Sequence, residues 1–114
     1  MIEQVRPADV RAWLAQFAGE EKPVLLDVRE AWELQTASVR PQEDFEFVHI
    51  PMHEIPQRQQ ELDPDRPTLC LCHHGMRSMN VAAYLHRAGF TQLGNVVGGI
   101  DAWSGEYDPQ VPRY

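Results

Sequence analysis

Short apolar runs alternate along the chain with segments of helical periodicity. Each run is only a few residues long and is bounded by proline, glycine or polar residues, which is typical of strands buried on both faces of a sheet. Five strands are expected on this pattern: Ile2–Val5, Val24–Val28, Phe47–Ile50, Thr68–Cys72 and Asn95–Val97.

Two segments show apolar residues at helical spacing. The first begins at Pro7, which suits the first position of a helix, and ends near Gly19. The second covers Ser78–Ala88 and is followed by Gly89, a residue type that often ends helices. The segment Leu34–Glu46 has no clear period, so we expect a loop with a short helix there.

Strands that alternate with helices predict an α/β fold, in which a mostly parallel central sheet carries helices on both faces. No repeat and no Gly/Ser-rich linker interrupts the 114 residues, and this length suits one domain. We therefore expect a single domain over residues 1–114. In open α/β sheets, ligands bind beyond the carboxyl ends of the strands, so the residues just past each run are candidates for a site.

The composition excludes several classes of protein. Ten basic residues stand against 17 acidic ones, giving a formal charge of -7, and Lys22 is the one lysine, so no clustered basic face is expected for nucleic acid. Two cysteines cannot build a disulfide scaffold, and no apolar stretch suits a membrane span or a signal peptide. The expectation is a cytoplasmic protein with free thiols.

The stretch Cys72–Ser78 carries the candidate chemistry. It follows a predicted buried strand and leads into a helix, so the Cys72 thiol would face unpaired backbone N–H groups and the positive end of the helix dipole. Such surroundings stabilise a thiolate or an anion carried on the sulfur. Gly75 permits a tight turn, and Arg77 adds a charge suited to an oxyanion. The pattern predicts a nucleophilic cysteine in an anion-binding loop.

The two cysteines are expected to differ in role. Cys70 alternates with Leu69 and Leu71 inside a predicted strand and has no charged neighbours, so we expect it to pack in the core. The alternative for Cys72 is the same structural role, because free cysteine is often buried. The strand, the glycine and the arginine that accompany Cys72 favour the functional interpretation.

Three blocks of this chain resemble the rhodanese-like sulfurtransferases. Cys72–Ser78 matches every fixed position of the family's active-site pattern Cys-x-x-Gly-x-Arg-Ser, while Leu26–Glu30 and Gly98–Trp103 resemble two further motifs in the same order. The likeness covers nearly the whole chain as one catalytic domain. One block departs from the pattern: the family often continues His-Ile-Pro with Gly-Ala, and here Met52 and His53 follow, so this side of the pocket is expected to differ in shape.

The resemblance implies that Cys72 accepts a sulfane sulfur from a small anionic donor, such as thiosulfate or a persulfide, and becomes a persulfide itself. An acceptor such as cyanide, a thiol or a protein then removes the sulfur. Arg77 would steer the donor, and neither a metal nor an organic cofactor is implied. The residues expected to form the anion-binding loop are His73, His74, Gly75, Met76, Arg77 and Ser78.

Several residues around this loop allow a functional and a structural interpretation. Asp27 and Arg29 stand at the end of a predicted strand, and the resemblance favours a supporting ion pair over contact with substrate. His73 and His74 could add positive charge when protonated, or their side chains could point to solvent. The other features are expected to be structural: His86 on a surface helix, Gly98-Gly99 as a turn close to the loop, and Trp13, Trp32 and Trp103 as core or core-edge aromatics.

Three functions other than sulfur transfer are compatible with parts of this sequence. A phosphatase or arsenate reductase of similar fold would have five residues between cysteine and arginine, but four separate Cys72 from Arg77. A non-catalytic rhodanese-like interaction or persulfide-carrier module is the second, although interaction modules commonly lack the cysteine. The third is a metal site, disfavoured because no spaced ligand pair is present. Its candidate ligands are Cys72, His73, His74 and either His49 or His53.

Overall fold

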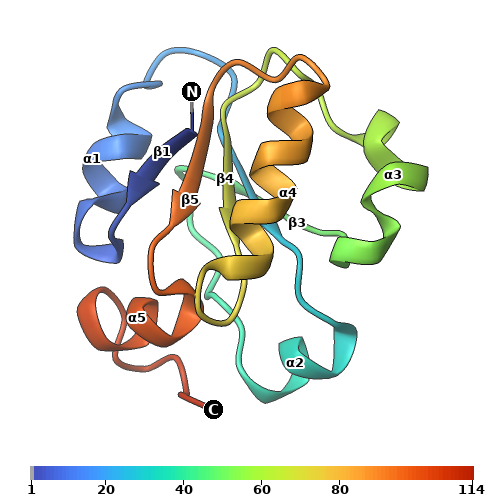
Figure 1. Cartoon of the computed structure of the whole chain (residues 1–114). Helices are drawn as coiled ribbons and strands as arrows, with labels where there is room; N and C mark the ends of the chain where they lie inside the picture. Colours follow the sequence, from blue (N-terminus) through green and yellow to red (C-terminus); the bar gives the residue numbers. More distant parts are fainter. Residues whose placement is uncertain (1) are drawn as a thin grey trace.

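A computed structural model describes residues 2–114, and in it five parallel strands form one sheet (Figure 1). The spatial order is β1-β5-β4-β2-β3, which places β4 in the centre. The strands are β1 (Ile2–Val5), β2 (Val24–Asp27), β3 (Glu46–His49), β4 (Thr68–Leu71) and β5 (Leu93–Val96).

Helices cover both faces of this sheet. In Figure 1, α1 and α5 lie on one side of the strands, and α3 and α4 lie on the other. Among the described residues, no helix is long and apolar enough to cross a bilayer. The helices are α1 (Val10–Ala15), α2 (Ala31–Thr36), α3 (Ile55–Arg58), α4 (Met76–Arg87) and α5 (Gly99–Glu106), with 3₁₀ turns at Pro7–Asp9, Met52–Glu54 and Gln59–Glu61.

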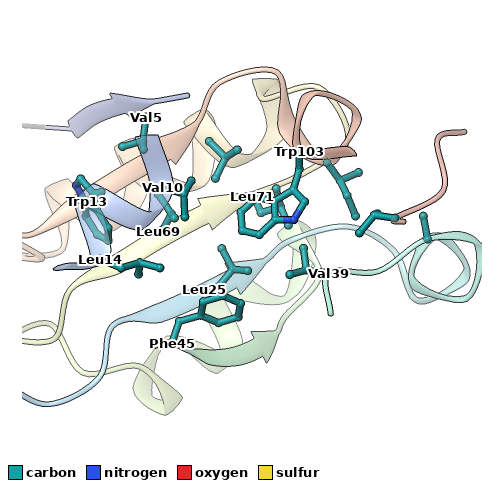
Figure 2. Packing of buried hydrophobic residues seen from close by; sticks show 14 of the residues in the cluster. Val5, Val10, Trp13, Leu14, Leu25, Val39, Phe45, Leu69, Leu71 and Trp103 are labelled. Carbon is teal, nitrogen blue, oxygen red and sulfur yellow. The ribbon is translucent and has the colours of Figure 1, made fainter. Parts of the chain in front are cut away.

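Two hydrophobic clusters form the core, one on each face. The cluster in Figure 2 packs Trp13 of α1 and Trp103 of α5 against strand residues such as Leu69. The opposite cluster places Cys70 and Leu26 against α3 and α4. Successive strand residues point to alternate faces, and both faces of β2 and β4 are buried, which is why these two strands appear as apolar runs in the sequence.

The α/β fold, the parallel sheet and all five predicted strands are confirmed, with shifts of one or two residues at their ends. β5 begins at Leu93, two residues before its predicted start. The prediction began late because Gly94 interrupts the apolar pattern of the sequence. α4 begins at Met76, two residues before its first predicted position, and ends before Gly89, which has a φ of 102°. The first turn of α4 continues the loop that begins at Cys72 and carries no apolar repeat.

Three expectations need correction. The short helix predicted within Leu34–Glu46 is α2, which begins earlier, at Ala31, because Glu30 and Glu33 form a capping box at its start. Neither α3 nor α5 was predicted, because both are short and α5 begins at Gly99, directly after Gly98 at its N-cap. Trp32 is not a core residue, since it is 61% exposed on α2.

Candidate active site

Cys72 lies directly after β4, the central strand, and its side chain is only 1% exposed. Its sulfur accepts a hydrogen bond from the backbone N–H of Gly75, with N and Sγ 3.1 Å apart. The turn depends on Gly75, because its φ of 107° is a left-handed conformation that other residues rarely adopt. This turn brings the backbone of the loop against the sulfur.

The hydroxyl of Ser78 also faces the sulfur. Its Oγ lies 3.3 Å from Cys72 Sγ and 2.5 Å from Oδ1 of Asn95, on the neighbouring strand β5. The carbonyl oxygen of Gly75 is a third acceptor, also 3.3 Å from Oγ. A serine has one hydroxyl proton, so the three acceptors compete for it. Asn95 in turn donates from Nδ2 to the carbonyl of Gly75 at 3.3 Å. Asn95 therefore supports both groups that contact the sulfur.

The turn into α5 holds the Cys72 loop through two backbone hydrogen bonds. Gly98 and Gly99 both have positive φ, and the N–H groups of Ile100 and Asp101 donate to the carbonyls of Cys72 and His73 at 2.8 and 3.1 Å. A Cβ at position 99 would lie 2.3 Å from the His73 oxygen, so only glycine fits this approach. The expected role of the glycine pair is confirmed.

Arg77 is not a free cation in this loop. Its two terminal nitrogens each lie 2.8 Å from an oxygen of Glu33, so the guanidinium and the carboxylate form a bidentate pair. The side chain of Glu33 is 4% exposed and that of Arg77 is 32% exposed. The hydrogen bond from Arg77 lowers the pKa of Glu33 to about 2, so the carboxylate is charged at neutral pH. The steering charge expected from the sequence is thus opposed by an adjacent negative charge.

Asp27 and Arg29 form the ion pair that the structural interpretation anticipated. Both side chains are fully buried, and Arg29 donates from Nε and Nη2 to both carboxylate oxygens, at 2.8 to 3.1 Å. Arg29 Nη1 donates to the hydroxyl of Tyr114 at 2.9 Å, and this hydroxyl donates to Glu33 at 2.7 Å. A continuous chain of bonds therefore joins β2, α2, the C-terminal segment and Arg77.

The histidines of the loop stack on one another and on Tyr114. The rings of His73 and His74 are 3.8 Å apart, and His73 lies 3.9 Å from the Tyr114 ring at an interplanar angle of 2°. His73 is half-buried, with Nε2 2.7 Å from the Tyr114 carbonyl oxygen, while His74 is exposed. His86 is exposed on α4, as expected. Met76 is 78% exposed beside the loop.

One group of potential metal ligands occurs in the described part of the chain. It consists of His73, His74 and Asp101, whose ligand atoms lie within 4.8 Å of one another, and it does not include Cys72. Asp101 is paired with Arg113 at 3.0 Å, and stacked imidazoles direct their in-plane lone pairs alongside each other. The ligand set considered from the sequence, centred on Cys72, is not the set brought together.

The second cysteine is in the core, as predicted. Cys70 is fully buried inside β4, and burial raises the pKa of its thiol to about 12. Both cysteines are free thiols. Cys70 therefore stays protonated at neutral pH, whereas the Cys72 sulfur has hydrogen-bond donors beside it.

Comparison with known proteins agrees with this geometry. The protein-family model of the rhodanese-like domain matches residues 10–106 of this chain. The chain belongs to the rhodanese-like family. It is 37% identical over 107 residues to YtwF of Bacillus subtilis, which carries a provisional sulfurtransferase name; the match covers 94% of this chain and 98% of YtwF. It is 34% identical over 97 residues to the thiosulfate sulfurtransferase GlpE of Pseudomonas savastanoi, covering 85% and 87% of the two chains.

A solved rhodanese-like structure has the same architecture. The rhodanese-related protein of Thermoplasma volcanium is 27% identical to this chain and superimposes with a TM-score of 0.75, over 98% of this chain and 99% of that one. The rhodanese-like fold expected from the three sequence blocks is therefore confirmed over nearly the whole chain.

Three residues of the site were not identified from the sequence. Asn95 is a polar residue within a buried strand, which is the signal that could have revealed it. Glu33 and Tyr114 lie 44 and 81 residues from their respective partners, Arg77 and Glu33, so local patterns do not reveal them. Together they determine the electrostatic setting of the loop.

Proposed function

We propose that this protein is a sulfurtransferase that transfers a sulfane sulfur through a persulfide on Cys72. The observation that carries the proposal is the position of the sulfur: a buried thiol at the end of the central strand, with the Gly75 N–H at 3.1 Å and the Ser78 hydroxyl at 3.3 Å. One catalytic domain over residues 1–114 would contain all the groups the reaction needs.

With thiosulfate as donor, the Cys72 thiolate attacks the outer sulfur. A new S–S bond forms on Cys72, the S–S bond of thiosulfate breaks, and sulfite leaves with the electron pair. The terminal sulfur of the persulfide then carries the negative charge. The first N–H groups of α4, at Met76, Arg77 and Ser78, have no acceptor inside the helix, so they are available to stabilise this charge.

The acceptor completes the cycle. Cyanide or a thiolate attacks the outer sulfur of the persulfide, the S–S bond breaks, and the Cys72 thiolate is regenerated as leaving group. A protein thiol is a further candidate acceptor. The cycle requires a reduced Cys72, which suits the cytoplasm or another reducing compartment.

The test is the intact mass of the protein after incubation with thiosulfate. We expect the mass to rise by one sulfur atom and to return on addition of cyanide, with thiocyanate as product. Cys72→Ser should abolish both changes while the circular dichroism spectrum stays the same. The matched control is Cys70→Ala, which removes the core thiol and should still form the persulfide.

The outcomes separate the candidate functions. Full thiocyanate production by Cys72→Ser would refute the proposed mechanism. No added sulfur on the wild-type protein would favour a non-catalytic interaction module. A persulfide that forms but is not discharged by cyanide or by thiols would favour a persulfide carrier.

A further inference from the structure

The charge balance around the Cys72 loop bears on which sulfur donor this site accepts. Arg77 is the arginine within the loop, and Glu33 pairs with it through two bonds of 2.8 Å. Two further donors fix the carboxylate: the Tyr114 hydroxyl at 2.7 Å and the backbone N–H of Glu30 at 2.9 Å. Four hydrogen bonds therefore hold Glu33 in a buried position where it cannot turn away from Arg77.

The other two arginines that border the loop are also paired. Arg29 is joined to Asp27 in the fully buried pair. Arg113 is joined to Asp101, whose helix supports the loop, by two bonds of 3.0 and 3.1 Å. Each arginine thus faces one carboxylate. The positive potential that remains at the sulfur comes from backbone N–H groups and the start of α4, whereas the chain as a whole carries a charge of -7.

We infer that Glu33 is a specificity-determining residue: by cancelling the charge of Arg77, it makes the site favour a persulfide donor over thiosulfate. This inference rests on the proposed function. Thiosulfate brings two negative charges to the loop, but a persulfide brings one when ionised and none when protonated. The second charge of thiosulfate meets no unpaired arginine, so its approach gains little electrostatic energy.

The transfer from a persulfide is balanced without any further reagent. The Cys72 thiolate attacks the terminal sulfur of R–S–SH, a new S–S bond forms on Cys72, and the S–S bond of the donor breaks. The thiolate R–S⁻ leaves with the electron pair and takes up a proton from water. Cys72 is left as a persulfide, as in the reaction with thiosulfate.

The test measures how fast Cys72 gains one sulfur from each of two probes, thiosulfate and cysteine persulfide, in single-turnover reactions followed by intact mass. The two probes differ in intrinsic reactivity, so the quantity compared between variants is the ratio of the two rate constants. In Glu33→Gln, Arg77 is left uncompensated, and the ratio should shift toward thiosulfate by about tenfold, because one unit of charge now acts on the additional negative charge of the dianion.

Two variants act as controls. Glu61→Gln changes the net charge by the same amount, but Glu61 is paired with Arg58 on a different part of the surface, so the ratio should stay at the wild-type value. Glu33→Gln combined with Arg77→Gln removes both charges of the pair. This double variant should return the ratio to near the wild-type value if charge, rather than shape, sets the preference.

If Glu33→Gln does not fold, a measurement on the wild-type protein still tests the inference. Raising the potassium chloride concentration from about 0.01 M to 0.1 M shortens the Debye length from about 30 Å to 10 Å. With a balanced loop on an acidic protein, the thiosulfate reaction should become faster or stay the same. A marked decrease would overturn the inference, because it would show net attraction of the dianion.

The remaining outcomes distinguish this inference from the proposed function. If both donors add sulfur to Cys72 but Glu33→Gln leaves their ratio unchanged, the role of Glu33 is wrong and the sulfurtransferase proposal stands. If neither donor adds sulfur to the wild-type protein, the proposed function itself is wrong, and the donor preference falls with it.

Discussion

At the residue scale, the single proton of Ser78 matters most. Its acceptors are Asn95 Oδ1 at 2.5 Å and, at 3.3 Å, both Cys72 Sγ and the Gly75 carbonyl oxygen; the shortest contact favours Asn95 when the sulfur is a neutral thiol. A thiolate or a persulfide anion is a stronger acceptor, so ionisation of Cys72 should draw the proton toward sulfur. The hydroxyl would then contribute to the reaction only in the charged state.

Ser78→Ala should therefore slow persulfide formation from thiosulfate by about tenfold, since a hydrogen bond to a charged group contributes roughly 1.5–3 kcal/mol. The measurement is the single-turnover rate followed by intact mass. Ser104→Ala is the matched control, because Ser104 is another buried serine whose hydroxyl donates to the Val111 carbonyl in α5's C-terminal flank. An unchanged rate in Ser78→Ala would show that the hydroxyl does not act on the sulfur.

The sequence reveals contacts between residues that lie close together along the chain, but not contacts between distant residues. Cys72, Gly75 and Ser78 lie within seven consecutive residues, so one motif revealed the contacts among them. The pairing of Arg77 with Glu33 joins positions 44 residues apart, and a single sequence does not show it. The charge of Arg77 was therefore predicted correctly, but its neutralisation was not.

At the element scale, α5 positions the active-site loop through its first residues. The predicted glycine turn was correct in place and purpose, because Gly98 and Gly99 bring the backbone of α5 against His73. The helix itself was missed, since it is only eight residues long and begins with Gly99, and glycine is a poor helix former. The inner strands β2 and β4 were easier to predict because burial on both faces leaves a nearly continuous apolar run.

Gly99→Ala should disrupt this contact. The added Cβ would lie 2.3 Å from the His73 oxygen and 2.5 Å from the Cys72 oxygen, so the loop must shift away from α5. Loss of two loop hydrogen bonds, together with strain at a positive φ, should lower the unfolding free energy by roughly 2–4 kcal/mol. Urea unfolding measures the change, and persulfide formation should fall with it.

Gly105→Ala, in the same helix, is the control for this prediction. A Cβ at position 105 would meet only Arg113, at an ordinary 3.6 Å. Alanine is the better helix former by about 0.5–1 kcal/mol, so this variant should be as stable as the wild type or more so. Equal stability of the Gly99 and Gly105 variants would mean that α5 does not support the loop.

At the scale of the whole molecule, the sequence predicted a parallel sheet but not the order of its strands. The order β1-β5-β4-β2-β3 makes the strand before Cys72 the central one, with Asp27 and Asn95 on its two neighbours. Alternation of strands and helices implies parallel pairing, whereas the order depends on which helix covers which face. The hydrogen-bonded network from Asp27 to Arg77 depends on this order, because β2 must lie beside the strand that leads to Cys72.

This network makes global stability depend on pH through Glu33. Its pKa is lowered from 4.5 to about 2 in the folded protein, chiefly by the hydrogen bond from Arg77. Because the folded state favours the carboxylate, the stabilisation is fully present above about pH 5 and is lost as the pH falls toward 2, with a size on the order of 3 kcal/mol.

The measurement compares urea unfolding of the wild type and Glu33→Gln between pH 7 and pH 2.5. Glutamine does not titrate, so the difference in unfolding free energy between the two proteins should shrink across this range, because below about pH 4.5 the wild-type carboxylate takes up a proton on unfolding. Glu61→Gln removes an exposed carboxylate paired with Arg58, and its difference from the wild type should change much less. If the difference in unfolding free energy between the wild type and Glu33→Gln stays constant with pH, the pair of Glu33 and Arg77 does not stabilise the fold. Its role would then be confined to the Cys72 loop.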